Sequence, residues 1–102
     1  MKLNKLSKDE ERIVLECLKA TVEGPFFPDR EFHTLFGMER NEIARIMDMW
    51  PHVNKLDEKV NLAINNSIIN LLGYPHKCGN FWSQFISVPP SDLKELFKRL
   101  KQ

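Results

Sequence analysis

The sequence has few cysteines, no excess of one charge and no long apolar run. Its two cysteines, Cys17 and Cys78, form no Cys-x-x-Cys pair and no framework of short spacings, which excludes a disulfide-stabilised miniprotein and predicts two free thiols. Fifteen basic residues against fourteen acidic ones leave a net charge of +1. No global electrostatic field therefore attracts nucleic acid, anionic lipid or an acidic substrate.

Apolar stretches are also short. No run approaches the roughly 18 apolar residues of a membrane span, and the N-terminus becomes charged before a stretch of signal-peptide length develops. We therefore expect a cytoplasmic protein without a membrane partner. At 102 residues with 42% hydrophobic and 28% charged residues, residues 1–102 form one globular domain with a modest core.

Helical periodicity dominates the rest of the chain. Ser7 and Glu10 have the spacing of a capping box, and Val14, Cys17 and Leu18 follow at helical intervals, which predicts a first helix from Ser7 to Glu23. Gly24 is expected to supply a left-handed stop, and Pro25 prevents the helix from continuing.

Four further helical segments are predicted from caps and apolar stripes. They are a short helix capped by Asp29 and ended by Gly37, a helix from Glu39 to Trp50, a central helix from Asp57 to Gly73, and a last helix capped by Ser91. Between the last two, residues 74–90 are expected to fold over the core as a loop with a helical turn near Asn80 to Phe85. No segment alternates as a strand does. The predicted fold is all-α, a compact single-domain bundle of four to five helices with a long aromatic-rich loop before the C-terminal helix. Its core is expected to come from the first, third, fourth and last helices.

The central helix contains four asparagines, which are poor helix formers: Asn61, Asn65, Asn66 and Asn70. We expect an internal network in which their amides hold loop carbonyls around Tyr74 to Pro90. The alternative is that Asn61 and Asn65 present a polar face to a partner, because residues four apart lie on one side of a helix.

The segment from Phe32 to Trp50 resembles a helix-turn-helix unit. Gly37 lies in the turn and Met38 follows it, while His33 stands where that family prefers a small residue. The resemblance implies DNA reading through Glu39 to Arg45, and the residues that would face the major groove include Arg40, Asn41 and Arg45.

Local charge opposes this interpretation. Between Pro25 and Pro51, three basic residues face five acidic ones, and phosphate neutralisation normally supplies most of the affinity for DNA. DNA binding is therefore the alternative function rather than the leading one.

Motifs for metals, cofactors and catalysis are incomplete. His76-x-Cys78 offers two zinc-capable ligands from one loop, but no second pair accompanies them, so we expect neither a metal nor a cofactor. The sequence lacks a phosphate-binding glycine loop, a G-x-S-x-G elbow and a dinucleotide fingerprint, and we expect no enzymatic activity.

Aromatic residues gather in two proline-bounded loops, GPFFPD and LGYPH. With these two segments, the chain resembles small, uncharacterised bacterial all-helical proteins, and this resemblance implies no known activity. Stiff aromatic loops lose little entropy on binding, so the leading hypothesis is a non-enzymatic adaptor, inhibitor or immunity-type module that binds another protein. The expected contact residues are Phe26, Phe27, Tyr74, His76 and Trp82. The alternative is that Phe26, Phe27 and Trp82 plug the bundle.

Overall fold

The computed structural model describes residues 1–102 and confirms an all-α, compact single domain without strands. Its helices are α1 (Lys8–Glu23), α2 (Asp29–Phe36), α3 (Arg40–Met49), α4 (Glu58–Gly73), α5 (Trp82–Phe85) and α6 (Pro90–Lys101), with 3₁₀ turns η1 (Leu3–Lys5) and η2 (Gly79–Phe81). There are six α-helices rather than four to five, because residues Trp82–Phe85 form a separate short helix, α5. The helical turn expected near Asn80 to Phe85 is η2 followed by α5.

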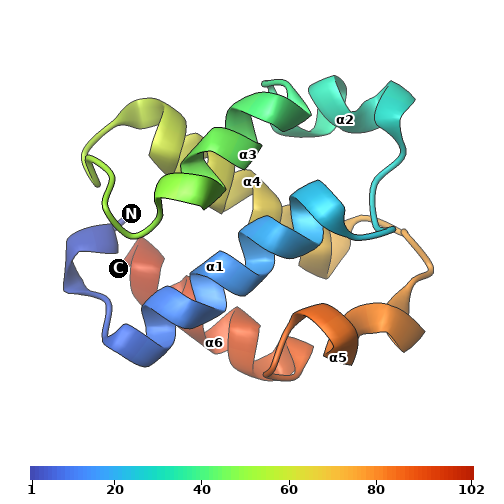
Figure 1. Ribbon diagram of the computed structural model, residues 1–102. Coiled ribbons are helices and arrows are strands. Elements are labelled where there is room, and N and C mark those ends of the chain that lie inside the picture. Colours follow the sequence, from blue (N-terminus) through green and yellow to red (C-terminus); the bar gives the residue numbers. More distant parts are fainter.

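Helices α1 and α4 form the centre of the molecule. Helix α1 packs against α3, α4 and α5, whereas α4 packs against α1, α2 and α6 (Figure 1). The sequence pattern identified α4 as the central helix, and α1 shares that role. The pair α2 and α3 therefore lies on one side of the centre, and α5 and α6 lie on the other.

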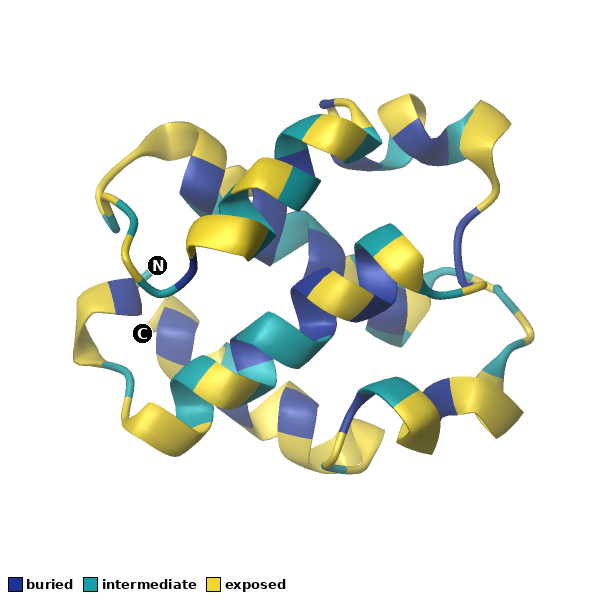
Figure 2. Cartoon of the chain, in the orientation of Figure 1, coloured by how far each residue is buried: buried dark blue, intermediate teal, exposed yellow.

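One apolar core of 22 buried residues joins these helices (Figure 2). It includes Ile43 of α3, Ile68 of α4 and Leu93 of α6, as the apolar stripes predicted. It also includes Phe32 and Phe36 of α2, so the short second helix contributes more to the core than expected. None of the helices is both long and apolar enough to cross a lipid bilayer.

Three of the predicted helix ends are confirmed. Ser7 Oγ accepts from the Glu10 backbone N–H at 3.1 Å, and Glu10 Oε1 accepts from the Ser7 N–H at 2.9 Å. This backbone hydrogen bond, followed by the contact with Arg99 of α6, lowers the pKa of Glu10. Gly37 ends α2 in the left-handed conformation with φ of 70°, and Asp57 caps α4 by accepting from Lys59 N–H at 2.7 Å.

Three other end positions differ from the prediction. Gly24 is extended, with φ of −83°, and is not left-handed; a Cβ there would lie 2.5 Å from the Ala20 carbonyl oxygen, so close packing requires the glycine. Asp29 is the first residue of α2 rather than its cap, which is Pro28. Helix α6 begins at Pro90 with Pro89 as its cap, because proline suits the first helical position, and Ser91 lies inside the helix.

The asparagines of α4 form the expected internal network with a different partner. Asn66 Nδ2 donates to the Phe36 carbonyl at 2.9 Å, and Asn70 Nδ2 donates to the Leu35 carbonyl at 3.2 Å. These carbonyls belong to the last turn of α2, where a helix leaves them without backbone partners. The network therefore fastens α2 to α4 and does not hold the loop from Tyr74 to Pro90.

Both cysteines are free, and they differ in exposure. Cys17 lies in the centre of α1 with 1% of its surface exposed, and burial raises the pKa of its thiol. Cys78 is half-buried in the loop before η2.

Candidate functional site

The corner Gly24–Pro28 that follows α1 is part of the core. Phe26 and Phe27 are 1% and 4% exposed. The Phe26 ring packs edge-on against His76, with centroids 4.9 Å apart, and Phe27 packs against Phe36 at 5.0 Å. The expectation that these two phenylalanines are exposed contact residues is therefore wrong, because the corner turns both rings inward, where they plug the bundle.

Arg40 closes this corner from outside. Its guanidinium donates to the carbonyls of Thr21 (2.9 Å), Val22 (3.1 Å) and Phe27 (2.9 Å), and it lies over the ring of Phe32 at 4.2 Å. The first two carbonyls end α1 and have no helical partner of their own. Arg40 thus caps the end of α1, so its guanidinium is engaged within the protein and does not face outward as the helix-turn-helix resemblance implied.

The two helices of the segment that resembles a helix-turn-helix unit pack against different neighbours. Helix α2 packs mainly against α4, and α3 packs mainly against α1. Asn41 and Arg45 are exposed on α3. DNA binding through these two residues stays a prediction.

The segment Tyr74–Pro90 lines a surface groove and is called the groove segment. It is more exposed than the corner Gly24–Pro28. Tyr74 and His76 are half-buried. The Nδ1 atom of His76 accepts from the Cys78 backbone N–H at 2.9 Å, so Nε2 carries the proton and donates to the Leu71 carbonyl at 3.1 Å. Both ring nitrogens are therefore engaged by the protein itself. No group of three or more histidine, cysteine, aspartate or glutamate side chains lies close enough together to hold a metal ion.

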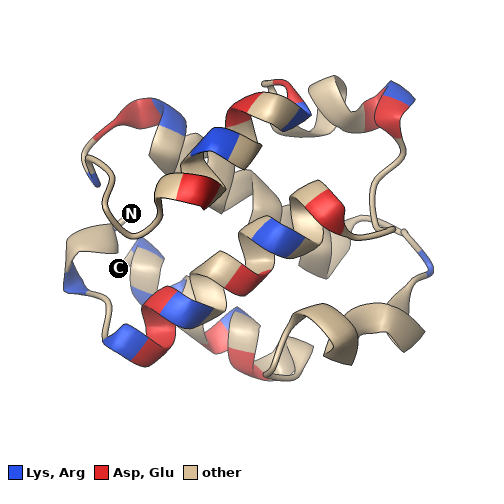
Figure 3. Ribbon diagram, viewed as in Figure 1, with Lys and Arg blue, Asp and Glu red and all other residues tan.

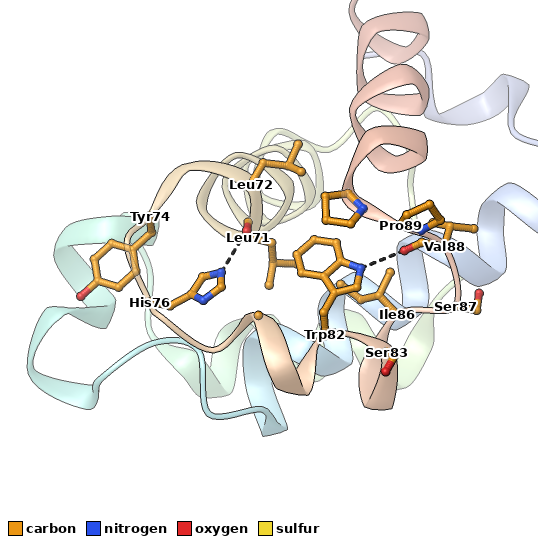
Figure 4. A pocket seen from close by; sticks show the side chains of 12 residues that line it. Leu71, Leu72, Tyr74, His76, Trp82, Ser83, Ile86, Ser87, Val88 and Pro89 are labelled. Carbon is orange, nitrogen blue, oxygen red and sulfur yellow. Dashed lines mark hydrogen bonds between the residues drawn. The ribbon is translucent and has the colours of Figure 1, made fainter.

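An open groove of about 610 Å³ lies between the end of α4, the groove segment and the start of α6 (Figure 4). Trp82 forms its floor and is fixed by a hydrogen bond of 2.8 Å from Nε1 to the Val88 carbonyl. Trp82 is 8% exposed, so only a small part of the ring lines the groove, and the expectation of an exposed anchor is wrong for this residue also. Around it lie Leu71, Leu72, Tyr74, His76, Gly79, Ser83, Ile86, Ser87, Val88, Pro89 and Pro90.

The Tyr74 hydroxyl points away from this groove, as Figure 4 shows. It donates to the Glu31 carboxylate of α2. This hydrogen bond is the main cause of the raised pKa of Tyr74. Tyr74 therefore contributes its ring, rather than its hydroxyl, to the groove.

The groove lies in the least charged part of the chain. Residues 61–91 contain one ionic side chain, Lys77, whereas the remaining residues carry both signs throughout (Figure 3). Exposed apolar side chains lie in the same stretch, including Ile69 at 45% and Phe81 at 37%. Sequence reasoning missed Leu72, Val88 and Pro89 as lining residues, although the presence of only one ionic side chain in residues 61–91 was visible in the sequence.

Comparisons of the chain with protein-family models, with curated proteins and with solved structures found no match.

Proposed function

We propose that this protein is a non-enzymatic interaction module that binds an uncharged, apolar segment of another protein in the groove. The observation that carries the proposal is the coincidence of the groove with residues 61–91, where Lys77 is the only ionic side chain. The cores of protein interfaces are depleted of charged residues and enriched in aromatic ones. The leading hypothesis from the sequence is kept, and its contact surface moves from the corner Gly24–Pro28 to the groove.

The chemistry of the groove favours an apolar occupant. Its most directional donors are already used, because the Trp82 N–H binds the Val88 carbonyl and the His76 N–H binds the Leu71 carbonyl. No ionic side chain lines the groove. A charged segment would lose water without gaining a partner, which is costly, whereas an apolar segment gains from the area it buries.

The walls of the groove are held before any partner arrives. Ser87 binds Glu16 of α1 through its backbone N–H at 2.9 Å and its hydroxyl at 2.8 Å, and Pro89 and Pro90 follow directly. At the opposite end of the groove, His76 holds the backbone through its hydrogen bonds with the Leu71 carbonyl and the Cys78 N–H. Binding therefore orders few side chains, which reduces the entropy lost on association.

A peptide-display selection tests the proposal. A library of random peptides is selected on the wild-type chain, and the enriched peptides are expected to be rich in apolar residues and poor in charged ones. The variant Ser83→Lys places a long cation in the groove from an exposed position of α5, and it should lose these peptides.

The matched control is Thr34→Lys, which adds the same charge at an exposed position of α2 that lies outside the groove. It should bind the peptides as the wild type does. Enrichment of charged peptides, or equal binding by Ser83→Lys, would contradict the proposal. Circular dichroism of both variants checks that each keeps the helical fold.

A further inference from the structure

His76 binds a carbonyl that α4 itself cannot satisfy. In a continuing helix the Leu71 carbonyl would accept from the N–H four residues on, but that residue is Pro75, which has no N–H. The Tyr74 N–H, three residues on, donates to the Asn70 carbonyl instead, at 2.9 Å. The Nε2–H of His76 therefore completes the C-terminus of α4, at 3.1 Å from the Leu71 oxygen (Figure 4).

The second ring nitrogen of His76 closes a tight turn. Nδ1 accepts from the N–H of Cys78, two residues on, at 2.9 Å. The residue between them, Lys77, has a positive φ of 59°, and no other residue except a glycine has a positive φ in this chain. That left-handed conformation is costly for a residue with a side chain, so surrounding contacts must hold it. The hydrogen bond from Cys78 to His76 is one such contact, because it spans Lys77.

The two hydrogen bonds of the His76 ring respond differently to a proton. Histidine changes its charge between about pH 5 and 8, and the protonated ring carries a hydrogen on both nitrogens. Nε2 then still donates to the Leu71 carbonyl, and the C-terminal end of a helix favours a cation. Nδ1 can no longer accept from Cys78, because two N–H groups would face each other. Protonation thus breaks one bond and leaves the other in place.

The groups around His76 supply no counter-charge. The rings of Phe26 and Phe27 lie 4.9 and 6.4 Å from its ring, and neither the end of α4 nor α5 contributes an ionic side chain to the groove. The nearby titratable side chains are the Cys78 thiol, which donates to the His76 carbonyl at 3.2 Å, the exposed Lys77 amine, and the Tyr74 hydroxyl, which is bound to Glu31. A proton on His76 therefore makes it the only charged side chain in the groove lining.

We propose that the hydrogen bond from Cys78 to His76 is a pH-sensitive latch of the groove, closed when His76 is neutral and open when it is protonated. Opening releases the rim of the groove, because Gly79 follows Cys78 directly and lines the groove. Acidification therefore loosens one wall and places a charge beside an apolar occupant, which weakens its binding. The effect on binding rests on the proposed function, whereas the latch itself is a property of the free protein.

NMR of the free protein tests the latch. The ring signals of His76 report its protonation from about pH 7.5 to about pH 5. The latch is followed by the protection of the Cys78 amide against hydrogen exchange, expressed relative to an unstructured peptide at the same pH. This protection is expected to fall about tenfold as His76 becomes protonated, because one hydrogen bond is lost. The amide of Ile68, in the middle of α4, should keep its protection.

Two replacements of His76 fix the latch in each state. His76→Asn keeps an acceptor near the position of Nδ1, because asparagine accepts from the N–H two residues on, and it does not become protonated. His76→Gln carries its amide further out, so it can reach the Leu71 carbonyl but leaves the Cys78 N–H free. The Cys78 amide should be protected at both pH values in the first variant and unprotected at both in the second. The matched control, His52→Asn, removes an exposed histidine outside the groove and should respond to pH as the wild type does.

Binding of the selected apolar peptides tests the effect on the groove. Peptides without ionisable groups are used, so that any pH dependence comes from the protein. The affinity of the wild type is expected to fall at least about tenfold between neutral pH and about pH 5, whereas that of His76→Asn should change less than about twofold.

Three results would overturn the proposal. They are a His76 ring that stays neutral down to about pH 5, a Cys78 amide whose protection is unchanged while His76 is protonated, and peptide binding by His76→Asn that depends on pH as strongly as that of the wild type. Absence of peptide binding at neutral pH would contradict the proposed function, and the NMR experiment on the free protein would still decide the latch. Circular dichroism at both pH values checks that each variant keeps the helical fold.

Discussion

The corner Gly24–Pro28 and the groove segment Tyr74–Pro90 both combine aromatic residues with prolines, yet one is closed and the other open. In the corner, Phe26 and Phe27 are buried, and the guanidinium of Arg40 binds the backbone from outside. In the groove segment, Trp82 contributes only an edge, and a groove remains beside it. Composition alone does not decide whether such a segment fills the core or lines a surface. The way the surrounding helices pack against the segment decides it.

Truncation of a corner ring should give the largest effect. Phe26→Ala removes a ring that packs against His76, Trp82 and Phe85, and its loss should lower the free energy of unfolding by about 3–5 kcal/mol. Urea denaturation measures the change. A loss below about 1 kcal/mol would mean that the corner can open without disturbing the core, and the contrast between the two segments would fail.

Removal of the external clamp should come next. Arg40→Met keeps an apolar stem but leaves the carbonyls of Thr21, Val22 and Phe27 without their donor, which should cost about 2–3 kcal/mol. Arg40→Lys should cost less, because it keeps a charge but lacks the planar fork. The same denaturation experiment orders the three proteins, and a stability of Arg40→Met equal to that of the wild type would show that the clamp is dispensable.

Two glycines allow a further comparison of the segments, because Gly24 begins the corner and Gly73 directly precedes the groove segment. Gly24→Ala would place a Cβ 2.5 Å from the Ala20 carbonyl oxygen and should destabilise the fold by about 1–3 kcal/mol. Gly73→Ala meets no atom within 4 Å and should be neutral or stabilising by about 0.5–1 kcal/mol. Thermal melting of both variants checks that the two changes in stability have opposite signs. Two stability changes of the same sign would refute the difference in packing at the two glycines.

The smallest effect concerns the hydrogen bond from Tyr74 to Glu31. Because this bond raises the pKa of Tyr74 above its ordinary value of 10.0, its stabilisation is present below that pH and is lost as the pH rises through the folded-state pKa. Tyr74→Phe should therefore melt slightly below the wild type at pH 8, and the two should converge at alkaline pH. A constant difference up to pH 11 would show that the ring rather than the hydroxyl matters.

Local features of the fold were readable from the sequence. The capping box of Ser7 and Glu10, the left-handed Gly37 and the cap of Asp57 each depend on residues within a few positions of one another. The start of helix α6 was misplaced by two residues, because a serine cap at Ser91 and a proline at the first helical position are competing signals for the start of a helix.

Contacts between distant residues were not readable. The carbonyls that Arg40 binds lie 13 to 19 positions away, and those that Asn66 and Asn70 bind in α2 lie 30 and 35 positions away. Polar side chains of this kind show their type but not their partner, because the partner is set by how the helices pack. For the same reason the sequence suggested contact residues at the corner, whereas the groove depends on how α4, α5 and α6 meet.

Because Cys17 is buried and Cys78 is half-buried, the reactivity of the two thiols can report separately on global and local opening of the fold. Thiol reagents attack the thiolate, and burial both hides the Cys17 sulfur and disfavours its ionisation. Alkylation at Cys17 therefore requires separation of the central helices, whereas alkylation at half-buried Cys78 requires only local movement of the groove segment. The two labelling rates, followed by mass spectrometry, would measure global unfolding and local breathing in one native sample, without a probe added to the chain.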